Sequence, residues 1–105
     1  MEFGFFMRGQ FPPEMDMQET FAELCEQARV ADDLGYSYIL SGQHYSTSPM
    51  QVLQLVPFLS RIMVEAPNVK LVTGIVLLPL HKPLDIAEQL ASIDIMSGGR
   101  LVFGS

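Results

Sequence analysis

Short apolar runs along the chain are separated by longer stretches in which apolar residues recur every three or four positions. The runs open near residues 3, 36, 69 and 101, at intervals of about 33 residues. Continuous apolar runs predict buried strands, and the helical spacing between them predicts helices with one buried face. Strands that alternate with helices in this way predict a parallel α/β sheet.

Four strands and three helices are expected from these patterns. The longest apolar run covers residues 69–78 and is interrupted at Thr73 and Gly74, which is typical of a strand buried on both faces. A glycine inside such a strand marks a bulge or a close approach to the backbone. The expected strands are residues 3–7, 36–40, 69–78 and 100–103, and the expected helices are residues 17–34, 49–65 and 83–96.

Cap residues define the ends of the first and third helices. Asp16 and Glu19 have the spacing of a capping box at the start of the first helix. Pro83 is suited to the first position of the third helix, because its fixed φ angle is already helical. Ser97-Gly98-Gly99 should end that helix, since glycine adopts the left-handed C-cap conformation at little cost.

The second helix has less regular boundaries. Ser48 can cap it and Pro49 can open it, which places its start directly after the polar loop that follows the second strand. Pro57 lies within the expected helix and removes a backbone donor. We therefore expect a kink at Pro57 or a later start of the helix.

Two architectures fit this alternation, a doubly wound sheet and a (β/α)₈ barrel. Eight units of this size would need about 260 residues, close to the usual length of such barrels. The dinucleotide fingerprint G-x-G-x-x-G is absent after the first strand, which weakens the doubly wound interpretation. The 105 residues stop at a fourth strand with no helix to cover it. As a barrel, residues 1–105 form one partial domain of three and a half βα units, truncated C-terminally.

Composition narrows the choice of partners. A net charge of −6 without any Lys/Arg cluster argues against a nucleic-acid partner and, more weakly, against a membrane surface. There is no signal-peptide pattern, and the longest apolar run is about half the length of a membrane span, so a cytoplasmic protein is expected. The single cysteine, Cys25, excludes a disulfide framework and should be buried. No metal-ligand spacing occurs, and no metal site is expected.

In both architectures, functional sites form at the carboxyl ends of the strands. His44 follows the second strand and is the best candidate for chemistry, because imidazole can give or take a proton near neutral pH. His81 lies further from a strand end and is interpreted as a polar turn residue. Asp94 and Arg100 are expected to form a structural ion pair across the end of the third helix. The four candidate segments are residues 7–9, 41–44, 74–80 and 104–105.

Two stretches of the sequence resemble a known family. The segment TGIVLLPLHKPLDIAEQLASIDIMSGGRLVFGS is similar to the N-terminal half of the bacterial luciferase-like, flavin-dependent monooxygenases. The loop SGQHYSTSP resembles the loop after the second strand of that family, often written E-H-H or Q-H-Y. The resemblance covers essentially the whole chain, and S-G-G-R-L with its preceding helix is the most specific part.

The resemblance implies a TIM barrel with a flavin across its C-terminal mouth. It implies oxidation of a small organic substrate with reduced FMN and O₂, or hydride transfer in branches that use the deazaflavin coenzyme F420. His44 matches the active-site histidine of the family, which implies proton transfer or hydrogen bonding near the flavin. Gln43 matches a cofactor-facing position that is often acidic, so an acid–base role of Gln43 stays open.

Further residues are assigned to the cofactor by the same resemblance. Gly74–Ile75 matches a bulge, frequently a non-prolyl cis peptide, that supports the flavin ring. Gly104–Ser105 matches the backbone that passes the ring after the fourth strand. A homodimer through the second and third helices is also implied. The phosphate grip belongs to the other half of the barrel, so the 105 residues alone are expected to bind flavin weakly or not at all and to be inactive.

Two other interpretations stay open. One is a catalytically silent subunit of the same fold, which loss of His44 in close relatives would favour. The other is a small, complete, doubly wound domain that binds a nucleotide. Its missing phosphate loop and its uncovered last strand count against it.

Overall fold

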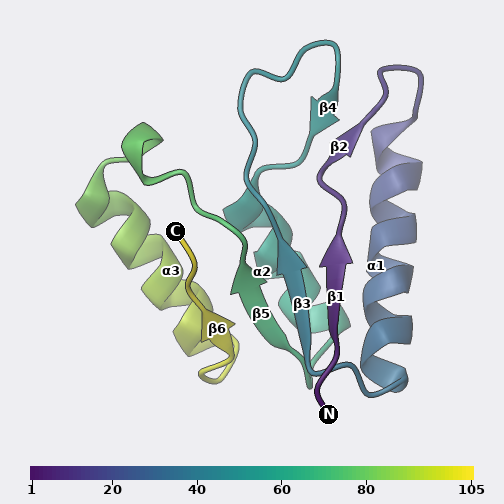
Figure 1. Ribbon diagram of the computed structural model, residues 1–105, viewed down its shortest axis with the longest axis vertical. Helices are drawn as coiled ribbons and strands as arrows, with labels where there is room; N and C mark the ends of the chain where they lie inside the picture. Colours follow the sequence, from purple (N-terminus) through teal and green to yellow (C-terminus); the bar gives the residue numbers. More distant parts are fainter.

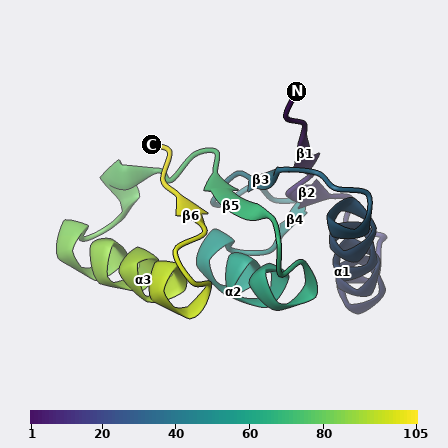
Figure 2. The ribbon, with the colours of Figure 1, turned by 90° about the horizontal axis from the view of Figure 1, so that it is seen from below.

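The computed structural model describes residues 1–105 as one four-stranded parallel sheet with three helices packed on one of its faces (Figures 1 and 2). The strands pair in the order β1-β3-β5-β6, which is also their order along the chain. The strands are β1 (Gly4–Met7), β3 (Tyr38–Ser41), β5 (Lys70–Thr73) and β6 (Leu101–Val102), and the helices are α1 (Met17–Asp33), α2 (Leu55–Glu65) and α3 (Pro83–Met96).

This topology decides between the two architectures. A doubly wound sheet reverses its strand order at a switch point and carries helices on both faces. Here the strand order never reverses, and Figure 2 shows all three helices on the same side of the sheet. Successive strands with helices on the outside form the wall of a (β/α)₈ barrel. The predicted α/β fold with parallel strands is therefore confirmed.

The face of the sheet away from the helices corresponds to the barrel interior. Phe6, Leu40, Val72 and Val102 are register partners across the four strands and form one row on this face. Their neighbours in the strands, such as Met7 and Thr73, are buried on the helix-covered side, because successive side chains of a strand point to opposite faces. In a closed barrel, the side chains of this row would point into the interior.

The core lies between the sheet and the helices. Seventeen buried residues form one cluster, which includes Ile39 and Leu71 from the strands and Leu59 and Ile62 from α2. Cys25 is buried as expected, and its burial raises the pKa of the thiol. None of the helices is long and apolar enough to cross a membrane.

The third predicted strand is much shorter than residues 69–78. The strand β5 ends at Thr73, and the rest of the apolar run forms an extended loop and a short 3₁₀ helix, η1 (Leu78–Leu80). Val76 is nevertheless buried, and its N–H donates to the carbonyl oxygen of Gly104 at 2.9 Å. The predicted strand was therefore too long. Buried apolar residues give the same sequence pattern in a loop as in a strand, so the pattern could not show where the strand ends.

The predicted start of the second helix at Pro49 was also wrong. The helix α2 starts at Leu55, the later start that Pro57 allowed, and Pro57 lies in its first turn, where a missing N–H removes no helical bond. The preceding residues form β4 (Gln51–Val52), which pairs antiparallel with β2 (Gln10–Phe11). The peptide before Pro49 is cis. Strands of two residues are too short to show an alternating pattern.

The Asp16 cap of the first helix and the expected ends of the third helix are confirmed, whereas the Glu19 side chain does not complete the capping box. The Asp16 carboxylate accepts from the backbone N–H groups of Gln18 at 2.8 Å and Glu19 at 3.1 Å. Pro83 is the first residue of α3. Gly98 and Gly99, which follow its C-cap, have φ angles of 72° and 79°, in the left-handed region that favours glycine.

The expected ion pair between Asp94 and Arg100 is replaced by a different arrangement. The Asp94 carboxylate accepts from the Leu101 N–H at 3.1 Å. The Arg100 guanidinium donates to four backbone carbonyls, those of Met63, Ala66, Val69 and Ser97, at 2.7–2.9 Å. The last carbonyl groups of a helix have no N–H partner within the helix. Arg100 provides hydrogen-bond donors for these carbonyl groups where α2 and α3 end.

Candidate functional site

A glycine follows each of the four parallel strands. Gly9, Gly42, Gly74 and Gly104 lie one or two residues beyond the ends of β1, β3, β5 and β6. Figure 1 shows β1, β3 and β5 pointing toward the edge of the sheet that carries β2 and β4. Because the strands are parallel, these glycines lie at the same edge, where the sites of α/β barrels form. We call these four residues the glycine edge.

Three positions of the glycine edge leave no room for a side chain. A Cβ atom on Gly104 would lie 2.3 Å from the carbonyl oxygen of Thr73. A Cβ atom on Gly42 would lie 3.0 Å from the carbonyl oxygen of Gly74, and one on Gly74 would lie 2.8 Å from the Leu40 side chain. These glycines therefore allow neighbouring segments to approach closely at this edge, where Gly42 is buried and Gly74 and Gly104 are half-buried.

Thr73 connects β5 to the end of the chain. Its Oγ1 donates to the carbonyl oxygen of Gly104 at 3.0 Å and accepts from the Gly104 N–H at 2.7 Å. Sequence reasoning noted Thr73 only as a break in an apolar run. A hydroxyl at the last position of a buried strand was the signal that could have identified it.

The peptide between Gly74 and Ile75 is cis, as the family resemblance led us to expect. The N–H of Gly74 donates to the carbonyl oxygen of Ser41 at 2.8 Å, so the sheet pairing extends to this peptide. The Ile75 side chain is exposed. The cis peptide and the Ile75 side chain thus lie at the end of β5, next to the end of β3.

His44 lies across the start of the glycine edge. Its Cδ2 atom is 3.4 Å from the position of a Cβ atom on Gly9, and its Nε2 atom is 3.8 Å from that position on Gly42. Its backbone carbonyl accepts from Nε2 of Gln54, the N-cap residue of α2, at 3.0 Å. Neither ring nitrogen of His44 has a hydrogen bond within the chain, so both can interact with a bound molecule.

Gln43 has a different position from its neighbour His44. The residue is 6% exposed. Its side-chain amide oxygen lies 2.8 Å from the Leu77 backbone nitrogen and 3.0 Å from Nε2 of His81. His81, expected only as a polar turn residue, is therefore linked to the loop that carries His44. The ring of Tyr45 meets the ring of His81 edge to face, with centroids 6.1 Å apart.

A polar cavity of about 260 Å³ lies beside this link, between the first turns of α2 and α3. Its polar lining consists of Gln43, Tyr45, Gln54, His81, Asp85 and Gln89. The side-chain oxygen of Gln54 is buried there without a hydrogen-bond partner. The expected site segments 41–44 and 74–80 are thus brought together by side chains as well as by the sheet.

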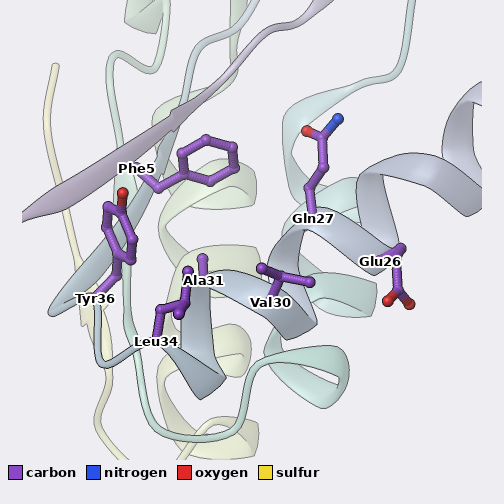
Figure 3. A pocket seen from close by; sticks show the side chains of 7 residues that line it. All are labelled: Phe5, Glu26, Gln27, Val30, Ala31, Leu34 and Tyr36. Atoms are coloured by element: carbon purple, nitrogen blue, oxygen red, sulfur yellow. The ribbon is translucent and has the colours of Figure 1, made fainter.

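A second hollow lies away from the glycine edge. Figure 3 shows Phe5 and Tyr36 facing Val30, Ala31 and Leu34 of α1 across an apolar groove of about 230 Å³. The rings of Phe5 and Tyr36 pack edge to face at 6.0 Å. The groove flanks β1, which is an outer strand of the sheet, and it contains none of the predicted site residues.

Comparison with known proteins decides the family. A family model described as luciferase-like monooxygenase matches residues 1–104. The chain belongs to this family. It is 28% identical over 105 residues to limonene 1,2-monooxygenase from Rhodococcus erythropolis, and 27% identical over 104 residues to 4-hydroxyprotoasukamycin monooxygenase from Streptomyces nodosus. The matches cover 100% and 99% of this chain but only 27% and 28% of those proteins.

Solved structures give the same result for the fold. The monooxygenase RslO1 from Streptomyces bottropensis matches 99% of this luciferase-like chain with a TM-score of 0.79 and 33% identity. The oxygenating constituent of 3,6-diketocamphane monooxygenase from Pseudomonas putida, solved with FMN, matches with a TM-score of 0.86 at 21% identity. The chain covers 33% and 29% of those structures, so it forms a partial barrel.

Proposed function

We propose that this chain contributes part of the flavin site and the catalytic histidine of a flavin-dependent monooxygenase that oxidises a small organic molecule with reduced FMN and O₂. The observation that supports this most directly is the half-buried backbone of Gly74 and Gly104 at the carboxyl ends of the strands that also carry the unpaired imidazole of His44. A planar ring system needs a surface without projecting side chains. Family membership supplies the reaction class.

The residues at this edge fit a flavin. The backbone of Gly74, Gly104 and Ser105 would face the ring, and the exposed side chain of Ile75 would support it. Gln43 would act indirectly, by holding the loop that contains Leu77. When bound, reduced FMN supplies the electrons for oxygen activation.

His44 is the proposed catalytic residue. Its ring is held over Gly9 and Gly42, and its backbone is fixed by Gln54. A positioned imidazole with a free nitrogen can donate a proton to, or accept one from, a bound substrate, which contributes about 10²–10⁴-fold to a rate.

The test uses the polypeptide encoded by the complete reading frame that contains these 105 residues. Titration with FMN should quench flavin fluorescence to a defined stoichiometry. His44→Ala should lower substrate oxidation about 100-fold or more while flavin still binds. Absence of saturable FMN binding, or full activity of His44→Ala, would contradict the proposal.

Hydride transfer with coenzyme F420 is the second candidate. It is favoured by 25% identity to the F420-dependent tetrahydromethanopterin reductase from Methanopyrus kandleri, which matches with a TM-score of 0.76. Competition between FMN and F420 for the same protein distinguishes the two. Tighter binding of F420, with bleaching of its absorbance by a reduced substrate, would replace the monooxygenase proposal.

We also propose that a homodimer forms through α2 and α3. Large apolar side chains on these helices are exposed, with Val64 at 68%, Leu84 at 74% and Ile95 at 79%. Leu84→Glu should shift sedimentation from dimer to monomer. Leu34→Glu on α1, at an equally exposed leucine of the groove in Figure 3, is the matched control and should leave the dimer intact.

A further inference from the structure

The side-chain oxygen of Gln43 joins two loops that are 34 residues apart in the sequence. It accepts the Leu77 N–H at 2.8 Å and lies 3.0 Å from Nε2 of His81. The first partner belongs to the loop that begins at the cis peptide, and the second lies just before α3. With 6% of Gln43 exposed, water has little access to this junction.

The chemistry of the three groups fixes where the protons are. A backbone N–H only donates, so the Gln43 atom that faces Leu77 must be the carbonyl oxygen. That same oxygen faces Nε2 of His81, and an oxygen without hydrogen can only accept. Nε2 of His81 must therefore carry a proton for the contact to be a hydrogen bond. In its neutral form, His81 then has Nδ1 free as an acceptor.

We propose that Gln43 is a positioning residue, which holds the loop of the cis peptide against the loop of His44 and fixes His81 with its proton on Nε2. Gln43 precedes His44 in the sequence, and the backbone carbonyl of His44 accepts a hydrogen bond from the Gln54 side chain. Both sides of the imidazole-bearing segment are thus fixed by glutamine side chains. This inference rests on the proposed flavin site, because the backbone that Gln43 arranges is the surface assigned to the ring.

Three variants of the complete polypeptide test this role. Gln43→Met keeps the length of the side chain and removes the acceptor, whereas Gln43→Glu keeps an acceptor oxygen and replaces the amide NH₂ by a second one. Gln89→Met is the matched control, since Gln89 lines the same cavity but bonds only to Asp85 on its own helix. Long-range ¹H–¹⁵N NMR spectra report which His81 nitrogen carries the proton, at about pH 8.5, where an ordinary histidine is neutral.

We expect Nε2 of His81 to be almost fully protonated in the parent, in Gln43→Glu and in Gln89→Met, and the fraction protonated at Nε2 to fall toward that of a free neutral imidazole in Gln43→Met. The FMN dissociation constant should rise about tenfold in Gln43→Met alone, because the Leu77 N–H is left without a partner. If Gln43→Met does not fold, Gln43→Asn withdraws the oxygen from both donors and should give the same two changes.

An unchanged His81 spectrum in Gln43→Met, or the same loss in Gln43→Glu, would overturn the positioning role. The two readouts also separate this inference from the proposed function. If the parent binds no flavin, the proposed function fails, while the His81 spectra still decide whether Gln43 fixes the proton.

Discussion

The hydroxyl of Thr73 and the backbone of Gly104 satisfy each other completely. Oγ1 donates once, to the Gly104 carbonyl oxygen, and accepts once, from the Gly104 N–H. Thr73 is 1% exposed, and Gly104 lies so close that a Cβ atom would strike the Thr73 carbonyl oxygen. The pair therefore fixes the path of the chain beyond β6, which is the part of the glycine edge that no sheet pairing holds.

Replacing Thr73 by valine should loosen this connection without changing its shape. The Gly104 N–H would be left unpaired, while the Gly104 carbonyl oxygen would keep the Val76 N–H. We expect a loss of about 1–3 kcal/mol in the free energy of unfolding, measured by urea denaturation. Thr73→Ser retains the hydroxyl and should recover most of the hydrogen-bond contribution. Equal losses in the two variants would show that the hydroxyl is not responsible.

Adding a methyl group at Gly104 should disturb the glycine edge directly. The new Cβ atom would lie 2.3 Å from a backbone oxygen, which cannot move without shifting β5. Overpacking of this kind costs about 1–3 kcal/mol, and we expect FMN binding to weaken at least as much. Gly35→Ala is the control, because its φ angle of 82° also disfavours a side chain, while the residue follows the end of α1 and lies outside the glycine edge. Calorimetric titration with FMN measures the difference, and equal affinities would contradict the assignment of Gly104.

The sequence predicted the parallel strands, the three helices and most of their ends, because these depend on local patterns. Asp16, Pro83 and Gly98 act within one turn of the chain, so their effects could be predicted without knowing the tertiary structure. The local patterns left the barrel and the doubly wound sheet open; the family resemblance implied the barrel, and the strand order agrees with it.

The sequence predicted which segments form the candidate site, but it did not predict the hydrogen bonds that connect them. His44 was predicted from its position after a strand and again from the family resemblance, whereas the cis peptide at Gly74 came from the resemblance alone, and its cis geometry is confirmed. The bond between Gln43 and His81 spans 38 residues, and that between Thr73 and Gly104 spans 31. Contacts at such separations depend on how the loops pack, so neither spacing nor composition could indicate them.

Among the charged residues, Arg100 should be the one whose substitution lowers the free energy of unfolding most. Its guanidinium donates to four backbone carbonyls from the ends of α2 and α3 and from the start of β5. Arg100→Lys keeps the charge but cannot reach four acceptors with one ammonium group. We expect a loss of about 3 kcal/mol in the free energy of unfolding, since hydrogen bonds to charged groups contribute about 1.5–3 kcal/mol each and are not additive. Arg61→Lys, at an exposed arginine, should change stability by less than about 1 kcal/mol. Similar losses for the two would contradict the role given to Arg100.

Glu65 should make stability depend on acid pH. It bonds to Arg61 at 2.8 Å and to Arg29 of α1, and these hydrogen bonds lower the pKa of its carboxyl below the ordinary value of 4.5. A carboxyl with a lowered pKa in the folded state stabilises the protein above its ordinary pKa and loses that contribution as pH falls through the lowered value. The parent should therefore be more stable than Glu65→Gln at neutral pH, and the difference should shrink below the ordinary carboxyl pKa. Urea denaturation across this acid range measures it, with Glu88→Gln on α3 as the control. A difference that stays constant through the acid range would show that the ion pairs do not produce the lowered pKa.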